Sequence, residues 1–161
     1  MGIKREFWLQ YSYNVMRALR TSQPVREPDA LGYPFISNDL IKTRAVLENV
    51  YATGVRTLLD VGAAIGNVVL LARQIGFAAH GIEIRPREHF TGILTPEAIE
   101  FAVDGMKFDH YDEYDAVYMS QSHPDNAVCE RLVNHILSQL RMGGTLIYCG
   151  IMSEPQIRRT V

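Results

Sequence analysis

Hydrophobic residues gather along the chain in short continuous runs, and stripes of helical spacing separate these runs. The runs cover about residues 57–61, 78–84, 99–103, 116–120 and 145–149. Their length and their bounding by turn residues predict five β-strands. Because strand and helix alternate, we expect an α/β domain with a parallel sheet and right-handed crossovers.

Capping and breaking residues place the ends of the helices between these strands. We predict a helix from Ser37 or Asn38 to about Ala52, a helix over 66–74 closed by Gly76, a short helix from Pro86 toward Ile93, and a long helix that follows Pro124 or Asp125 and stops at Gly143 and Gly144.

The N-terminal part of the chain has a different pattern. Apolar side chains at helical spacing over residues 4–20 predict one helix, and the prolines and glycine between Pro24 and Pro34 then interrupt regular structure. We therefore divide the chain into an N-terminal helix with a proline-rich segment, residues 1–36, and one folded domain, residues 37–161.

The composition limits the class of protein. The chain has 161 residues, 47% of them hydrophobic, which suffices for one globular core. A net charge of −2 argues against wholesale electrostatic binding of nucleic acid. The apolar runs are too short to span a bilayer, and no apolar signal core precedes them. Cys129 and Cys149 suit free thiols in a reducing compartment, so we expect a cytoplasmic protein without membrane contact.

Three carboxylates fall at or just past the ends of predicted strands. Asp60 closes the first, Glu83 lies near the end of the second, and Asp104 follows the third. In open parallel sheets, ligands bind at the carboxyl ends of the strands. The sequence therefore predicts a ligand site with an acidic rim.

The segment from Asp60 to Asn67, with the sequence DVGAAIGN, combines an acidic strand end with two glycines four residues apart. Small residues in such a strand-to-helix turn let a ligand approach the backbone. A dinucleotide site usually has the pattern G-x-G-x-x-G and places a diphosphate at the helix N-terminus. Asp60 would repel that diphosphate, and it suits a cationic ligand better. An ordinary turn without a ligand is the alternative.

This segment resembles the first motif of the class I S-adenosylmethionine-dependent methyltransferases, (D/E)-x-G-x-G-x-G, with Ala64 in place of the middle glycine. The resemblance covers about residues 37–150. It implies a three-layer αβα sandwich with strand order 3-2-1-4-5. The family adds a sixth and a seventh strand, which are expected here to be short or missing. The resulting free edge of the sheet could be covered by a partner chain, by a second copy or by the N-terminal segment.

The resemblance also assigns roles to the acidic residues, with S-adenosylmethionine as the cofactor. Glu83 would accept hydrogen bonds from the ribose hydroxyls, Asp104 from the exocyclic amine of adenine, and Asp60 would lie near the methionine end. The implied cofactor-binding residues are Asp60, Gly62, Ala63, Gly66, Asn67, Glu83, Asp104, Gly105, Met106 and Ser120.

His123, after the fourth predicted strand, is the candidate catalytic base because its ordinary pKa lies near neutrality. The alternative is that His123 merely bonds backbone groups ahead of the next helix, which Asp125 would cap. We interpret the acidic segment 109–115 as a solvated loop, and we expect no metal site.

Two functions follow from the sequence. The first is an S-adenosylmethionine-dependent methyltransferase of unknown acceptor, and the second is a non-catalytic methyltransferase-like binding or structural subunit that needs a partner chain. A nicotinamide-dependent oxidoreductase is a third candidate, which Asp60 disfavours.

Overall fold

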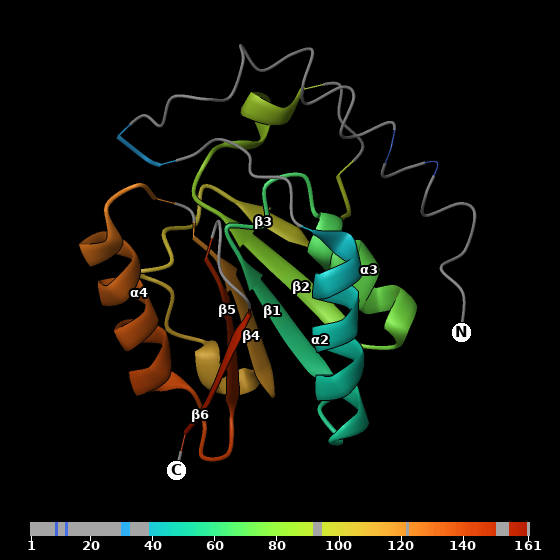
Figure 1. Cartoon of the computed structure of the whole chain (residues 1–161). Coiled ribbons are helices and arrows are strands. Elements are labelled where there is room, and N and C mark those ends of the chain that lie inside the picture. The colour runs from blue at the N-terminus through green and yellow to red at the C-terminus, as the bar shows by residue number, and fades with distance from the viewer. Residues whose placement is uncertain are drawn as a thin grey trace.

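The structure is a computed structural model, shown in Figure 1. It describes residues 9, 12, 30–32, 39–91, 95–121, 123–150 and 155–160. Most of the predicted N-terminal helix and proline-rich segment lies outside these residues.

Strands and helices alternate along the described chain, as the hydrophobic pattern predicts. The elements are α2 (Leu40–Ala52), β1 (Thr57–Val61), α3 (Asn67–Ile75), β2 (Ala78–Glu83), the 3-10 turn η1 (Arg87–Phe90), β3 (Ile99–Phe101), the 3-10 turn η2 (Tyr111–Glu113), β4 (Ala116–Ser120), α4 (Asn126–Gln139), β5 (Thr145–Cys149) and β6 (Gln156–Arg159).

The strands form one sheet in the order β3-β2-β1-β4-β5-β6. The first five strands are parallel, and β6 pairs antiparallel with β5. Helices α2 and α3 cover one face of the sheet and α4 covers the other (Figure 1). The predicted three-layer αβα sandwich and its strand order are confirmed, and β6 is the short C-terminal strand that the sequence leaves room for.

The core lies on both faces of the sheet because successive side chains of a strand point to opposite sides. In β1, Leu58 packs in the cluster with α2 and α3, whereas Leu59 and Val61 pack with α4. In β4, Tyr118 belongs to the first cluster and Met119 to the second. Burial on both faces explains why these strands are continuous apolar runs.

The ends of several elements differ from the prediction. Helix α4 ends at Gln139, before Gly143 and Gly144, because Leu140 already has extended backbone with a ψ of 138°. The short helix expected from Pro86 toward Ile93 is a 3-10 turn that ends at Phe90.

Asp39 caps α2 through its Oδ1, which accepts from the backbone N–H groups of Ile41 and Lys42, so the cap is neither Ser37 nor Asn38, both outside the described residues. Strand β3 stops at Phe101, because Ala102 has a φ of 61° that ends the extended backbone. Strand β2 stops at Glu83, one residue earlier than predicted.

Cys129 and Cys149 are free thiols, as predicted. Among the described residues, no helix has both the length and the apolar character needed to cross a bilayer.

Candidate functional site

The turn from β1 to α3 is fixed by hydrogen bonds to its neighbour strand. The N–H groups of Gly62 and Ala63 both donate to the carbonyl of Ile82, at 2.9 and 3.0 Å. Gly62 has a φ of 77°, a conformation that glycine adopts without strain. The first glycine of the motif therefore lets the chain leave β1 while the turn stays attached to β2.

Ala64 occupies the position where the resembled motif has its middle glycine. Its φ is 46°, so it adopts the left-handed conformation although it carries a Cβ. Its N–H donates to Oε2 of Glu83 at 2.8 Å. The turn thus keeps a conformation that suits glycine, and the hydrogen bond to the second strand helps to hold it there.

Gly66, the second glycine of the motif, packs against the segment around β3. It is the N-cap of α3 with a φ of 81°, and a Cβ there would come within 2.5 Å of Pro96 Cδ and 2.6 Å of Ile99 Cδ1. Gly66 therefore allows close packing of the turn against the segment around β3. It does not line the cavity described next.

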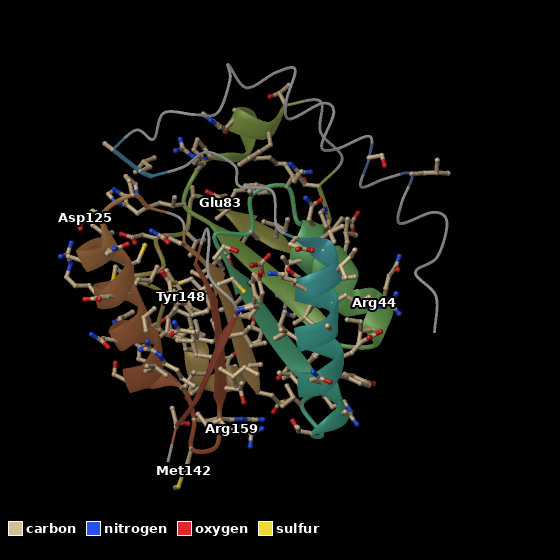
Figure 2. All side chains as sticks on the ribbon, in the orientation of Figure 1. Arg44, Glu83, Asp125, Met142, Tyr148 and Arg159 are labelled. Atoms are coloured by element: carbon tan, nitrogen blue, oxygen red, sulfur yellow. The ribbon has the colours of Figure 1, made fainter. Side chains whose placement is uncertain are left out.

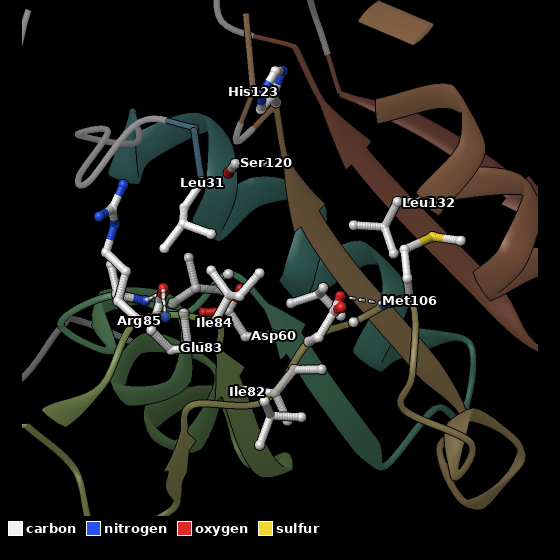
Figure 3. Close-up of a pocket in the computed structure, with 18 of the residues that line it drawn as sticks. Leu31, Asp60, Ile82, Glu83, Ile84, Arg85, Met106, Ser120, His123 and Leu132 are labelled. Carbon is white, nitrogen blue, oxygen red and sulfur yellow. Dashed lines mark hydrogen bonds between the residues drawn. The ribbon is translucent and has the colours of Figure 1, made fainter. Parts of the chain in front are cut away.

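A cavity opens at the carboxyl ends of β1, β2 and β4, the end of the sheet where Glu83 lies in Figure 2, opposite Met142 and Arg159. All the residues predicted to bind a cofactor, except Gly66, contribute to its lining, and so does His123 (Figure 3). The structure therefore brings residues from 60 to 123 together around one space.

Glu83 lies beside Asp60 at the base of this cavity (Figure 3) and is 5% exposed. Its two carboxylate oxygens accept from two backbone N–H groups, those of Ala64 at 2.8 Å and Arg85 at 2.9 Å. Burial raises the pKa of Glu83, and these hydrogen bonds and the charges of Arg85 and His89 act against that rise. Each oxygen keeps a lone pair for a further donor.

Asp60 is buried without such partners. It is 3% exposed, and its carboxyl group has no hydrogen bond within the described part of the chain. Burial first, and the nearby charge of Glu83 second, raise the pKa of Asp60 to about 8. A buried carboxylate without partners is costly, so this group favours a ligand that brings positive charge or hydrogen-bond donors.

Asn67, the first residue of α3, adds a second unsatisfied group to the wall. It is 5% exposed, and its Oδ1 has no hydrogen-bond partner in the described residues. Buried polar atoms in folded proteins nearly always have partners. The unsatisfied acceptor therefore belongs to a residue that also lines the cavity.

Asp104, Gly105 and Met106 form a turn on another side of the cavity. Oδ1 of Asp104 accepts from the N–H of Met106 at 3.0 Å. A Cβ on Gly105 would come within 3.3 Å of Leu132, Tyr111 and Val61, so a larger residue there would require these neighbours to shift. The turn places one carboxylate next to apolar side chains, which suits a flat ligand with a polar edge.

His123 follows β4 and also faces the cavity. Its Nδ1 accepts from the N–H of Asp125 at 3.0 Å, and Asp125 caps α4 by accepting from the N–H of Ala127. In the neutral ring, the proton is then on Nε2, which makes His123 a donor at that atom in this arrangement. This hydrogen bond is the backbone-bonding arrangement weighed above as the alternative to a base.

Several lining residues escape prediction from the sequence. Ile84 and Val103 adjoin the acidic strand ends, and their position next to Glu83 and Asp104 is the signal that could have found them. Val61, Ala64, Ile65, Val68 and Ile82 lie within or beside the predicted strand ends and the motif turn. Others come from elements whose proximity only the fold creates: Leu31, Arg85, Val128, Arg131 and Leu132. The helical spacing of Val128 and Leu132 predicts a core stripe and not a cavity wall.

No protein-family model and no curated protein matches the chain in sequence. Solved structures do share its fold. The sugar N-methyltransferase KedS8 from Streptoalloteichus sp ATCC 53650 is 24% identical with a TM-score of 0.56, over 79% of this chain and 57% of that one. For DesVI from Streptomyces venezuelae the identity is 13% and the TM-score 0.56, over 92% and 58%.

A third structure is S-adenosylmethionine-bound CalS10, an amino pentose methyltransferase from Micromonospora echinaspora, with 21% identity and a TM-score of 0.52, over 70% of this chain and 50% of that one. The chain thus spans little more than half the length of these proteins. At such identities the likeness concerns the fold. The chain has the α/β fold of class I methyltransferases, as the first motif predicts.

Proposed function

We propose that this chain binds S-adenosylmethionine in the cavity at the ends of β1 and β2 and transfers its methyl group to an acceptor. The observation that carries the proposal is Asp60, a buried carboxyl group without a partner at the base of the cavity. S-adenosylmethionine has a sulfonium and an ammonium group. Either cation would stabilise the ionised form of Asp60, which the protein itself leaves uncompensated.

The other lining residues fit the remaining parts of the same ligand. Glu83 can accept from ribose hydroxyls with the lone pairs that Ala64 and Arg85 leave open. Asp104 can accept from the exocyclic amine of adenine, between the apolar side chains of Ile84 and Leu132. Asn67, which has an unsatisfied Oδ1, belongs to the same lining. These roles agree with those that the family resemblance implies.

The bound cofactor would supply a methyl carbon already activated by the sulfonium. Since the displacement is in line, the protein contributes mainly by positioning. His123 would hold an acceptor oxygen or nitrogen through Nε2–H, and it could take a proton only after the ring releases the N–H of Asp125. We therefore assign His123 to acceptor positioning first and to general base catalysis second.

The non-catalytic subunit remains the second candidate function, and the hydrogen bond that occupies His123 Nδ1 favours it. A nicotinamide cofactor fits less well. Its diphosphate would lie near the acidic residues Asp60 and Glu83, and the neighbouring cation, Arg85, already acts on Glu83.

Titration calorimetry with S-adenosylmethionine, S-adenosylhomocysteine and NAD tests the binding. We expect the two adenosyl ligands to bind and NAD to give no heat. The Glu83→Ala variant should bind S-adenosylmethionine about tenfold more weakly, because it loses the ribose contacts. Glu100→Ala, at an exposed acid of the neighbouring strand β3, is the matched control and should bind as the wild type does. Equal affinity of the two variants would refute the ribose role.

Catalysis is tested with methyl-labelled S-adenosylmethionine and a panel of acceptors. The names of KedS8 and CalS10 make amino sugars the first members of the panel, followed by small hydroxyl compounds, proteins and nucleic acids. Label transfer that is lost in Asp60→Asn supports a methyltransferase. Tight binding without transfer to any acceptor supports the non-catalytic subunit.

A further inference from the structure

The short described segment 30–32 lies over the cavity, far in sequence from the strands that build its base. Leu31 contributes to the lining, although it is 47% exposed, and the next residue, Gly32, is buried. Figure 3 shows Leu31 between Ser120 and the end of β2, where Ile84 and Arg85 lie. Leu31 thus forms an outer wall of the site, with one side toward the cavity and the other toward solvent.

Arg85 connects this wall to the base of the site. Its side chain is buried at 3% exposure, and its Nη2 donates to the carbonyl of Gly32 at 3.1 Å. Its backbone N–H donates to Oε1 of Glu83, and its carbonyl accepts from Ala102 at 3.2 Å. One residue therefore joins the wall, the carboxylate at the end of β2 and the segment after β3.

Burial of a guanidinium group is unfavourable unless its N–H groups find partners. An apolar residue at position 85 would fill the same space without that cost, so core packing alone does not explain an arginine. One contact that uses the length of the arginine side chain is the hydrogen bond from its Nη2 to the carbonyl of Gly32. Lysine has no fork of donors, and it would hold this carbonyl less firmly.

We propose that Arg85 is a positioning residue that fixes the segment 30–32 as the outer wall of the cavity, and that Leu31 in this wall slows the release of the bound cofactor. The second half of this inference rests on the proposed function. The wall shields one side of the ligand from water, so its loss should act mainly on the dissociation rate.

Stopped-flow displacement of S-adenosylmethionine from the full chain measures that rate. We expect Leu31→Ala, a change at a half-exposed side chain that leaves the core intact, to dissociate about tenfold faster with little change in the association rate. Arg85→Lys should act in the same direction. Arg87→Lys, at an exposed arginine two residues further on, is the matched control and should match the wild type.

A double variant separates positioning from general destabilisation. If Arg85 acts through the wall, Arg85→Lys combined with Leu31→Ala should dissociate about as fast as the faster single variant. If the increases in dissociation rate of the two single variants multiply in the double variant, Arg85 does not act through the wall. If the rate of Leu31→Ala equals that of the wild type, Leu31 does not slow the release of the cofactor. Should Arg85→Lys fail to fold, the rate of Leu31→Ala still tests whether Leu31 slows the release of the cofactor.

Hydrogen exchange without any ligand keeps this inference apart from the proposed function. We expect the amides of residues 30–32 to exchange faster in Arg85→Lys than in Arg87→Lys, because the hydrogen bond from Nη2 of Arg85 to the carbonyl of Gly32 is weakened. Equal exchange would overturn the tether even if the cofactor binds. If the wild type binds no adenosyl ligand, the proposed function fails, and the exchange result still decides whether Arg85 holds the segment.

Discussion

The two ends of the sheet each hold an aspartate at a strand terminus, and these two aspartates are treated in opposite ways. At the amino ends of the strands, Asp115 accepts through Oδ2 from the N–H groups of Arg56 and Thr57, at 2.7 and 2.8 Å, and pairs through Oδ1 with Arg141. At the carboxyl ends, Asp60 is more deeply buried and has no hydrogen bond in the described residues. A saturated carboxylate serves the fold, whereas an unsaturated one is available to a ligand.

Asp115 should therefore matter for stability and not for binding. Its Asp115→Ala variant leaves two N–H groups and the Arg141 guanidinium without their acceptor, and we expect a loss of about 3 kcal/mol in the free energy of unfolding. Urea denaturation measures this loss. The cofactor affinity of the folded fraction should not change. Asp112→Ala, at an exposed aspartate of η2, is the control. If Asp115→Ala lost no more stability than this control, Asp115 would not stabilise the fold.

Asp60→Asn should show the reverse. Removal of a buried, unpartnered charge is expected to leave the free energy of unfolding at pH 8 unchanged or raise it by about 1 kcal/mol. The affinity for S-adenosylmethionine should fall about 100-fold, since a charged contact is lost. Calorimetry and urea denaturation of the same samples test both parts. Asp109→Asn, at an 81% exposed side chain, should change neither quantity. Unaltered affinity in Asp60→Asn would contradict the proposed function.

Asp60 should also make the stability of the fold depend on pH. The pKa of Asp60 is raised from 3.8 to about 8. Between about pH 4 and pH 8, therefore, the folded chain keeps a proton on Asp60 that the unfolded chain releases. The contribution of Asp60 to stability therefore falls as the pH rises through that window. The groups that face Asp60 are Glu83 on β2, whose charge raises the pKa of Asp60, and Cys149 on β5, whose own pKa is raised by burial and further by Asp60.

Binding of a cation should have the opposite pH dependence. Below pH 8 the cation must displace a proton from Asp60, so the affinity should rise with pH, by up to about tenfold per unit, and level off near pH 8. The slope should vanish in Asp60→Asn. Because the ligand's own titration is the same for both proteins, the ratio of their affinities between pH 6 and pH 9 isolates Asp60. A constant ratio would contradict this prediction.

The sequence predicts the strands and their acidic ends better than it predicts the contacts between distant segments. The bounds of β1, β4 and β5 agree with the prediction, because strands buried on both faces are continuous apolar runs with sharp ends. The acidic rim was predictable because parallel strands end on the same edge. The roles of Leu31 and Arg85 could not be predicted, since the hydrogen bond from Arg85 to Gly32 spans 53 residues and leaves no local pattern. The cap of α2 was also ambiguous, because three capping residues stand in a row at 37–39.

The smallest expected effect concerns the turn that joins Asp60 to the rest of the site. Ala64 is held at a φ of 46°, a conformation that costs a residue with a Cβ about 1 kcal/mol and costs glycine much less. Ala64→Gly should therefore not show the loss usually caused by added backbone freedom, and we expect a gain of up to about 1 kcal/mol in the free energy of unfolding.

Ala102→Gly is a matched comparison, since Ala102 also has a positive φ, of 61°, but lies outside the cavity lining. Both variants should gain stability if backbone strain is the cause. Only Ala64→Gly can also change the affinity for S-adenosylmethionine, because the N–H of Ala64 holds Glu83 at 2.8 Å. Urea denaturation that shows a loss in both variants would mean that neither turn is strained. If Ala64→Gly is more stable and binds S-adenosylmethionine as tightly as the wild type, then the N–H of residue 64 holds Glu83 in place even when residue 64 is glycine.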